Sequence, residues 1–147
     1  MILILLKDFF ICIAAVVFYS MLMNLPKNLI VYASVISGIG YVIYDLLKHF
    51  AENEIFGYFI ATLVIAVFGE AMARIKKTPS TLFVFPAIIP LVPGIGLYQT
   101  MLHLVRNEYE AAVSQGVQTV FIAGAMAVSI AIINVLARFI FPRKHKL

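Results

Sequence analysis

Cysteine and charged residues are both scarce in this sequence. Cys12 is the one cysteine, so the chain cannot form an internal disulfide and has no cysteine pattern of the kind that holds a metal. Asp, Glu, Lys and Arg together make up only 12% of the residues. The formal charge of +4 comes from basic residues at the edges of apolar runs and at the C-terminus. It does not form a basic patch interleaved with aromatic residues, so nucleic acid is not an expected partner.

Residue patterns that support catalysis are also lacking. No cluster of His, Cys, Asp and Glu has the spacing of metal ligands, so neither a metal nor another cofactor is expected. Gly94-Ile95-Gly96 lacks the third glycine and the strand–helix context of a phosphate-binding loop. Ser114 and Ser129 have no neighbouring histidine or acid to activate them as nucleophiles. The sequence therefore does not predict an enzyme.

Apolar residues, in contrast, fill most of the chain. They make up 63% of the sequence, and the mean hydropathy is +1.04. A soluble domain of this size cannot bury so much apolar surface, whereas a bilayer span needs about 20 apolar residues. The sequence predicts an all-α integral membrane protein that forms one domain over residues 1–147. Lys7 and Asp8 interrupt the order expected of a signal peptide, so the first run is taken as a retained span. Five spans are expected at about 2–23, 29–47, 55–73, 81–104 and 119–141.

The basic residues predict how these spans are oriented. Five spans place seven basic residues on the face that holds the C-terminus and three on the other: Lys27, Arg74, Lys76, Lys77, Arg143, Lys144 and Lys146 against Lys7, Lys48 and Arg106. Under the positive-inside rule, the C-terminus is cytoplasmic and the N-terminus is outside. In the alternative, the fourth segment is re-entrant and the chain has four spans, which would spoil this bias.

The fourth segment combines the apolar content of a span with strong helix breakers. Residues 85–98 contain Pro86, Pro90, Pro93, Gly94 and Gly96. Each proline removes a backbone donor and clashes with the preceding turn, so the helix is expected to be interrupted there. Unpaired backbone groups cannot face lipid, so the break should face protein or a polar cavity. Interrupted helices of this kind form many transport sites; the alternative is a kinked helix that serves only packing.

The polar groups expected at mid-membrane suit a small solute. The segment 86–96 adds freed backbone groups to the polar side chains of spans two to five: Ser37, Thr62, Tyr98, Gln99, Thr100 and Asn134. A half-helix that begins after Gly94 or Gly96 would direct its amide groups at the break, and such helix ends attract carboxylates. We therefore expect a small polar or zwitterionic substrate with an anionic group.

Two charged residues are predicted to lie just inside the membrane on helix faces that contain small residues. Glu70 follows Thr62 and Ala66 on the third span, and Arg138 follows Asn134 on the fifth. Small residues allow close helix packing, so we expect Glu70 and Arg138 to form an ion pair between these spans. Alternatively, each side chain reaches the interface separately.

The proline- and glycine-rich segment resembles a known family. Residues 89–101, Ile-Pro-Leu-Val-Pro-Gly-Ile-Gly-Leu-Tyr-Gln-Thr-Met, resemble the Pro-x-x-Pro-Gly-x-x-x-Tyr-x-x-Met segment of the threonine/serine exporter family. Residues 24–26 and 37–40 give weaker support. The resemblance is to the small C-terminal-half type, which works beside a separate N-terminal half. It implies roles in substrate binding or gating for the motif residues Pro90, Pro93, Gly94, Tyr98 and Met101.

The resemblance implies a transporter subunit in the plasma membrane of a bacterium. Members of the family export threonine and serine, and two-protein relatives are associated with dicarboxylates such as succinate. Because the N-terminal half is absent here, a second membrane subunit is the expected partner, beside the small-molecule substrate and the lipid bilayer. Two alternatives remain: a non-transporting scaffold or assembly subunit, and a homo-oligomeric pore for small solutes.

Overall fold

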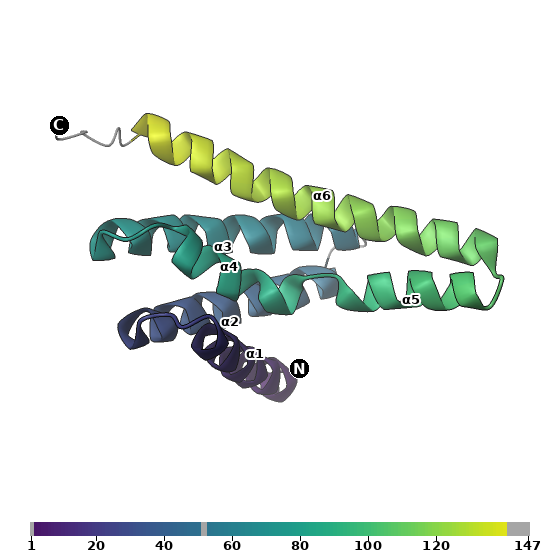
Figure 1. The fold of residues 1–147 in the computed structure, drawn as a ribbon, viewed down its shortest axis with the longest axis horizontal. Helices are drawn as coiled ribbons and strands as arrows, with labels where there is room; N and C mark the ends of the chain where they lie inside the picture. The colour runs from purple at the N-terminus through teal and green to yellow at the C-terminus, as the bar shows by residue number, and fades with distance from the viewer. Residues whose placement is uncertain (1, 51–52, 141–147) are drawn as a thin grey trace.

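The computed structural model describes residues 2–50 and 53–140, and the regular structure within them is entirely helical. The elements in chain order are α1 (Ile2–Leu22), α2 (Lys27–Phe50), α3 (Glu54–Lys76), α4 (Thr81–Ile88), the 3-10 helix η1 (Ile89–Leu91), α5 (Gly94–Val105) and α6 (Tyr109–Ile140). Figure 1 shows them as an elongated bundle in which α6 runs along α3. The all-α class is confirmed. The expected basic tail after residue 141 lies outside the described residues.

Four of these helices are long and apolar enough to cross a membrane: α1, α2, α3 and α6. The α4–η1 segment and α5 together pass the same test, but they are bent by 49° relative to each other. The described chain thus has four candidate spans, and a fifth if the bent pair crosses the membrane as one unit.

Asparagine and lysine residues at positive φ end three of the helices. Asn24 and Asn107 have φ values of 53° and 61°, and Lys77 has φ 53°. Asparagine tolerates this left-handed conformation better than most residues. Asn53 starts α3 differently, because its side-chain oxygen accepts a hydrogen bond of 3.2 Å from the amide of Ile55. These local signals make the connections short, so helices that follow one another directly in the chain run antiparallel.

The last helix differs from its predicted boundary. The final span is expected to begin near residue 119, whereas the helix that contains it, α6, begins at Tyr109 and runs without interruption to Ile140. At 32 residues it is about 48 Å long, well beyond the thickness of a bilayer core. Hydropathy marks only the apolar part of a helix, whereas the helix formers Glu110, Ala111 and Ala112 extend it backwards.

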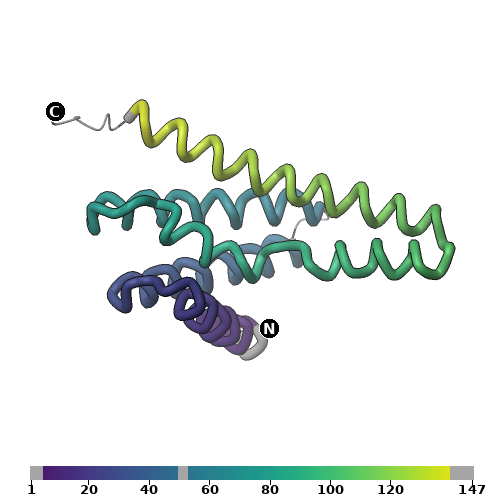
Figure 2. The backbone as a smooth tube through the Cα atoms, in the orientation of Figure 1, coloured from purple at the N-terminus to yellow at the C-terminus, as the bar shows by residue number. Residues whose placement is uncertain are grey.

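The segment α4–η1 lies at the centre of the packing (Figure 2). Cluster A joins α4 and η1 to α2, α3 and α6 through buried Ile36, Tyr44, Ala61, Ile65, Ala87, Leu91, Ile122 and Met126. Cluster B lies nearer the 23–26 and 77–80 turns and contains Val16, Leu29, Ala33, Ala73 and Phe83. Close approach is possible because Gly69 on α3 lies directly against Val84, where an added Cβ would come within 2.6 Å of Val84 Cγ2.

Helix α5 and the first part of α6 form a hairpin that projects beyond the ends of α2 and α3 (Figure 1). No residue of α5 is buried, and its exposed side chains include Ile95, Leu97, Tyr98 and Met101. At the turn of this hairpin, His103 Nδ1 of α5 lies 2.5 Å from Oε2 of Glu108, the residue before α6. Arg106 ends α5 and Glu110 belongs to α6, so these two residues lie on different helices.

Candidate functional site

The backbone is interrupted between η1 and α5, at Val92 and Pro93. Pro90 and Pro93 have no amide hydrogen to continue a helix, and η1 is a single 3-10 turn that ends at Leu91. Pro93 then serves as the N-cap of α5 without any side-chain cap. The amides of Ile95 and Gly96 fall in the first turn of α5, where an α-helix offers no carbonyl partner. The break therefore presents backbone donors.

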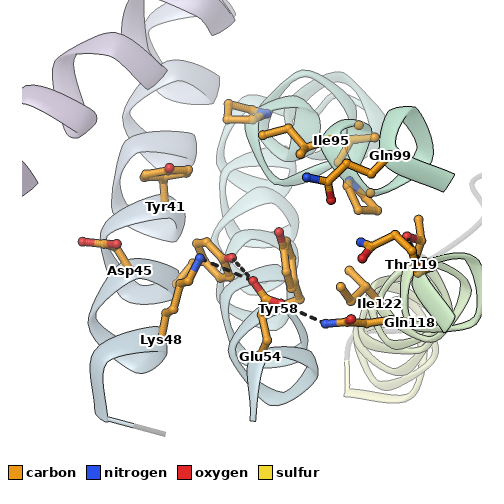
Figure 3. Close-up of a pocket in the computed structure, with 17 residues that line it drawn as sticks. Tyr41, Asp45, Lys48, Glu54, Tyr58, Ile95, Gln99, Gln118, Thr119 and Ile122 are labelled. Carbon is orange, nitrogen blue, oxygen red and sulfur yellow. Dashed lines mark hydrogen bonds and ion pairs between the residues drawn. The ribbon is translucent and has the colours of Figure 1, made fainter. Parts of the chain in front are cut away.

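A cavity of about 470 Å³ lies directly against this break. One wall is the backbone segment formed by Pro90 and residues 92–96. The other walls come from α2, α3 and the first half of α6, and α5 adds Gln99. Their lining residues, most of which are labelled in Figure 3, are Tyr41, Tyr44, Asp45, Lys48, Glu54, Tyr58, Gln115, Gln118, Thr119 and Ile122. Most of these side chains carry a polar group, although the surrounding helices are apolar.

Glu54 connects three helices at the rim of the cavity. Its Oε1 accepts a hydrogen bond of 3.2 Å from the Tyr44 hydroxyl and lies 3.4 Å from Lys48 Nζ, both on α2. Its Oε2 accepts a hydrogen bond of 3.1 Å from Gln118 Nε2 on α6. Figure 3 shows the carboxylate between these groups. The side chain of Glu54 is 34% exposed and that of Lys48 is 55% exposed, so this network remains open to solvent.

Aromatic rings line the wall opposite the break. The Tyr44 and Tyr58 rings have centroids 4.4 Å apart, and the Tyr41 ring lies 5.9 Å from that of Tyr44. Lys48 Nζ lies 5.9 Å from the centroid of the Tyr44 ring. Such π-faces attract cations, so this wall suits an ammonium group as well as apolar atoms.

Gly96 and Thr119 set the distance between α5 and α6 at the cavity. A Cβ added at Gly96 would lie 2.4 Å from Thr119 Oγ1, whereas one added at Gly94 would meet nothing within 4 Å. The Thr119 hydroxyl donates 2.7 Å to the carbonyl of Gln115, so it is fixed in place. Gly96 is therefore required for close approach of the two helices.

The predicted site residues fall into two groups. Pro90, Pro93, Gly94 and Gly96 line the cavity. The others do not: the side chains of Tyr98 and Met101 are exposed on α5, and that of Asn134 is exposed on α6.

Glu70 has a different partner from the one predicted. Glu70 Oε1 lies 2.7 Å from Arg74 Nη2, one turn further along α3, and the same nitrogen donates 2.8 Å to the carbonyl of Ala137 on α6. Arg138 itself is exposed. Arg74, and not a pair of Glu70 with Arg138, joins α3 to α6, by donating to a backbone carbonyl. From the sequence, Arg74 is expected in the loop after the third span, because the apolar run ends at residue 73. The helix α3 continues to Lys76.

Apart from Gln99, the polar side chains that line the cavity were missed in the sequence, although a signal for them exists. Polar and aromatic residues recur at helical spacing near one end of three segments: Tyr41, Tyr44, Asp45 and Lys48; Glu54 and Tyr58; and Gln115, Gln118 and Thr119. Spacings of three and four residues place side chains on one helix face. Only the packing of the helices brings these three faces together around the break.

Comparison with known proteins adds the following. A family model described as "Threonine/Serine exporter, ThrE" matches residues 8–136. An uncharacterised protein from Haemophilus influenzae is 27% identical over 126 residues, which cover 80% of this chain and 42% of the relative. The chain thus spans about two fifths of the length of this relative. No solved structure matches the chain.

Proposed function

Because the chain belongs to the threonine/serine exporter family, a family of membrane transporters, we propose that it is a subunit of a secondary transporter that exports small amino acids of the serine and threonine type. The observation that carries this proposal is the polar cavity against the interrupted backbone between η1 and α5. We propose that this cavity is the solute site.

The charges around the cavity favour a zwitterion over a dicarboxylate. Asp45 and Glu54 contribute two carboxylates against the one ammonium of Lys48. A substrate ammonium can approach Glu54 and the tyrosine wall, while its carboxylate meets the first-turn amides of α5. A dicarboxylate would bring two more negative charges to a site that is already acidic. The cavity volume of about 470 Å³ is ample for an amino acid with bound water.

The region matched in the relative is only 42% of that protein. The four or five candidate spans of the described chain form a small enclosure for a gated solute path. We propose that a second membrane subunit completes the transporter.

The proposed location is the bacterial plasma membrane, with the N-terminus outside and the C-terminus cytoplasmic. The described basic residues at the turn ends, Lys27, Arg74, Lys76 and Lys77, lie at the end of the bundle opposite the cavity. The positive-inside rule assigns that end to the cytoplasm. The cavity then lies in the outer half of the membrane.

The test is counterflow in proteoliposomes that contain this chain with and without the second subunit. We expect saturable exchange of labelled serine and threonine, dependent on both chains, with succinate exchanged poorly. Saturable exchange of succinate in preference to serine would contradict the substrate assignment. Non-saturable leak would indicate a pore, and full transport by the second subunit alone would indicate a scaffold.

A matched pair of variants tests whether the cavity is the site. Glu54→Gln removes the negative charge but keeps the shape of the side chain. The KM for serine should therefore rise about tenfold, which corresponds to the loss of one charge-assisted hydrogen bond. Glu110→Gln removes an exposed carboxylate from the first turn of α6, outside the cavity lining, and should leave KM within about twofold. Equal effects of the two substitutions would contradict the assignment.

A further inference from the structure

Four serine and threonine hydroxyls inside the described helices are bonded to their own helix backbone, whereas three other buried ones are not. Ser34, Thr100, Thr119 and Ser129 each donate to the carbonyl four residues earlier, at 2.7–2.9 Å. In contrast, the hydroxyls of Ser20, Ser37 and Thr62 are buried in their helices without a hydrogen-bond partner among the described residues. A buried unpartnered hydroxyl costs roughly 1–3 kcal/mol, so each of the three calls for an explanation.

Ser37 and Thr62 lie directly beneath the cavity. Ser37 is one helical turn from Tyr41 on α2, and Thr62 is one turn from Tyr58 on α3. A spacing of four residues keeps each hydroxyl residue on the same helix face as a cavity-lining tyrosine, about 6 Å deeper in the bundle. Both residues are almost fully buried, at 1% and 0% exposure.

The interrupted segment covers this level of the bundle. Ile36 and Ala61, the sequence neighbours of Ser37 and Thr62, belong to cluster A together with Ala87 and Leu91 of α4 and η1. Pro86 and Pro90 flank these residues and lack amide hydrogens, and the carbonyl of Pro86 accepts a hydrogen bond from the amide of Ile89. The two unpartnered hydroxyls therefore occur at the level of the bundle where α4 and η1 pack against α2 and α3.

We propose that the solute path continues from the cavity into the bundle past Ser37 and Thr62, between α2, α3 and the interrupted segment. This inference rests on the proposed transport function. In the conformation described, both hydroxyl residues are buried, and cluster B, which contains the fully buried Phe83, lies further along the bundle. When the interrupted segment shifts at its bend, the hydroxyls hydrogen-bond the polar groups of the solute or its water.

Cysteine accessibility tests the path directly. In a Cys12→Ala background, Ser37→Cys and Thr62→Cys replace each hydroxyl by a thiol of similar size. Ser34→Cys is the matched control, because Ser34 is equally buried on α2, at 1% exposure, but is bonded to the carbonyl of Ile30. A small water-soluble methanethiosulfonate is applied to native membranes that contain the whole transporter.

We expect residues 37 and 62 to react about tenfold faster than residue 34, because only hydrated thiols ionise and react, and serine should slow both reactions. Equal reactivity at all three positions, or no reaction at 37 and 62, would overturn the path. If residues 37 and 62 react but serine neither protects them nor undergoes counterflow in the parent protein, the amino-acid assignment fails and the path stands.

Transport measurements give a second, independent readout. Ser37→Ala and Thr62→Val should each lower the maximal rate of serine export about fivefold, the value of one hydrogen bond, with little change in serine affinity at the cavity. Ser34→Ala should change the rate less than twofold, because its hydroxyl serves only its own helix. Equal rates in Ser37→Ala, Thr62→Val and Ser34→Ala would contradict the proposal.

Discussion

At the scale of single residues, two neighbouring glycines of the motif have different roles. Gly94 and Gly96 both line the cavity, and both were predicted as site residues from the same motif. Gly96 lies against Thr119 on α6, whereas an added methyl at Gly94 would enter open space. Neither has a positive φ, so backbone conformation does not distinguish them. Only the close approach of α5 to α6 requires a glycine, and it does so at position 96.

The substitution Gly96→Ala should therefore destabilise the protein by about 1–3 kcal/mol, because the new methyl overlaps the fixed Thr119 hydroxyl. Gly94→Ala should leave stability unchanged or raise it by about 0.5 kcal/mol, since alanine is the better helix former. Thermal unfolding in detergent provides the measurement.

The double variant Gly96→Ala, Thr119→Ala should recover most of the lost stability, because the overlapping atom is then removed. Equal unfolding temperatures for Gly94→Ala and Gly96→Ala would show that the two helices do not approach each other as described.

At the scale of elements, α3 and α6 are joined at both ends by polar contacts. At one end Gln118 donates to Glu54, and at the other Arg74 bridges Glu70 and the carbonyl of Ala137. Between them the Ser129 hydroxyl donates 2.9 Å to the carbonyl of Phe59. These contacts fix the register of two parallel helices, which an apolar interface alone specifies weakly in lipid.

Replacing Arg74 with glutamine should lower stability by about 1–2 kcal/mol, because Glu70, with a side chain 17% exposed, loses its charged partner and Ala137 loses a donor. Arg138→Gln should have an effect below about 0.5 kcal/mol, since Arg138 is exposed. Unfolding temperatures in detergent compare the two. A larger loss in Arg138→Gln would restore the pair of Glu70 and Arg138 that the sequence predicts.

At the scale of the whole molecule, the question is whether the bent pair α4–η1 and α5 crosses the membrane. Two arrangements share the same 49° bend: one broken span, or a re-entrant loop that returns to its starting side. The parallel run of α3 and α6 favours one crossing, because α4–η1 and α5 must then carry the chain back to the end where α3 began.

Labelling with a membrane-impermeant maleimide distinguishes these arrangements. Thr81→Cys, at the start of α4, and Glu110→Cys, just after α5, flank the segment in a Cys12→Ala background, and both positions are exposed. We expect intact cells to be labelled at position 110 and permeabilised cells at both positions, as one broken span requires. Labelling of both positions from the same side would establish a re-entrant loop and four spans.

The sequence by itself determined the class of this protein, its apolar segments and the place where the fourth segment breaks. These depend on local chemistry: apolar runs long enough for a bilayer, and the missing amide hydrogens of Pro90 and Pro93, whereas α4 continues through Pro86. The full length of α6 lay beyond this reasoning, because hydropathy does not detect a helix that continues past its apolar part. Only the tertiary structure decided that Tyr41, Glu54 and Gln118 surround the break and that Arg74, not Arg138, joins α3 to α6. Such placements depend on how helices distant in sequence rotate and pack against one another, which no local pattern specifies.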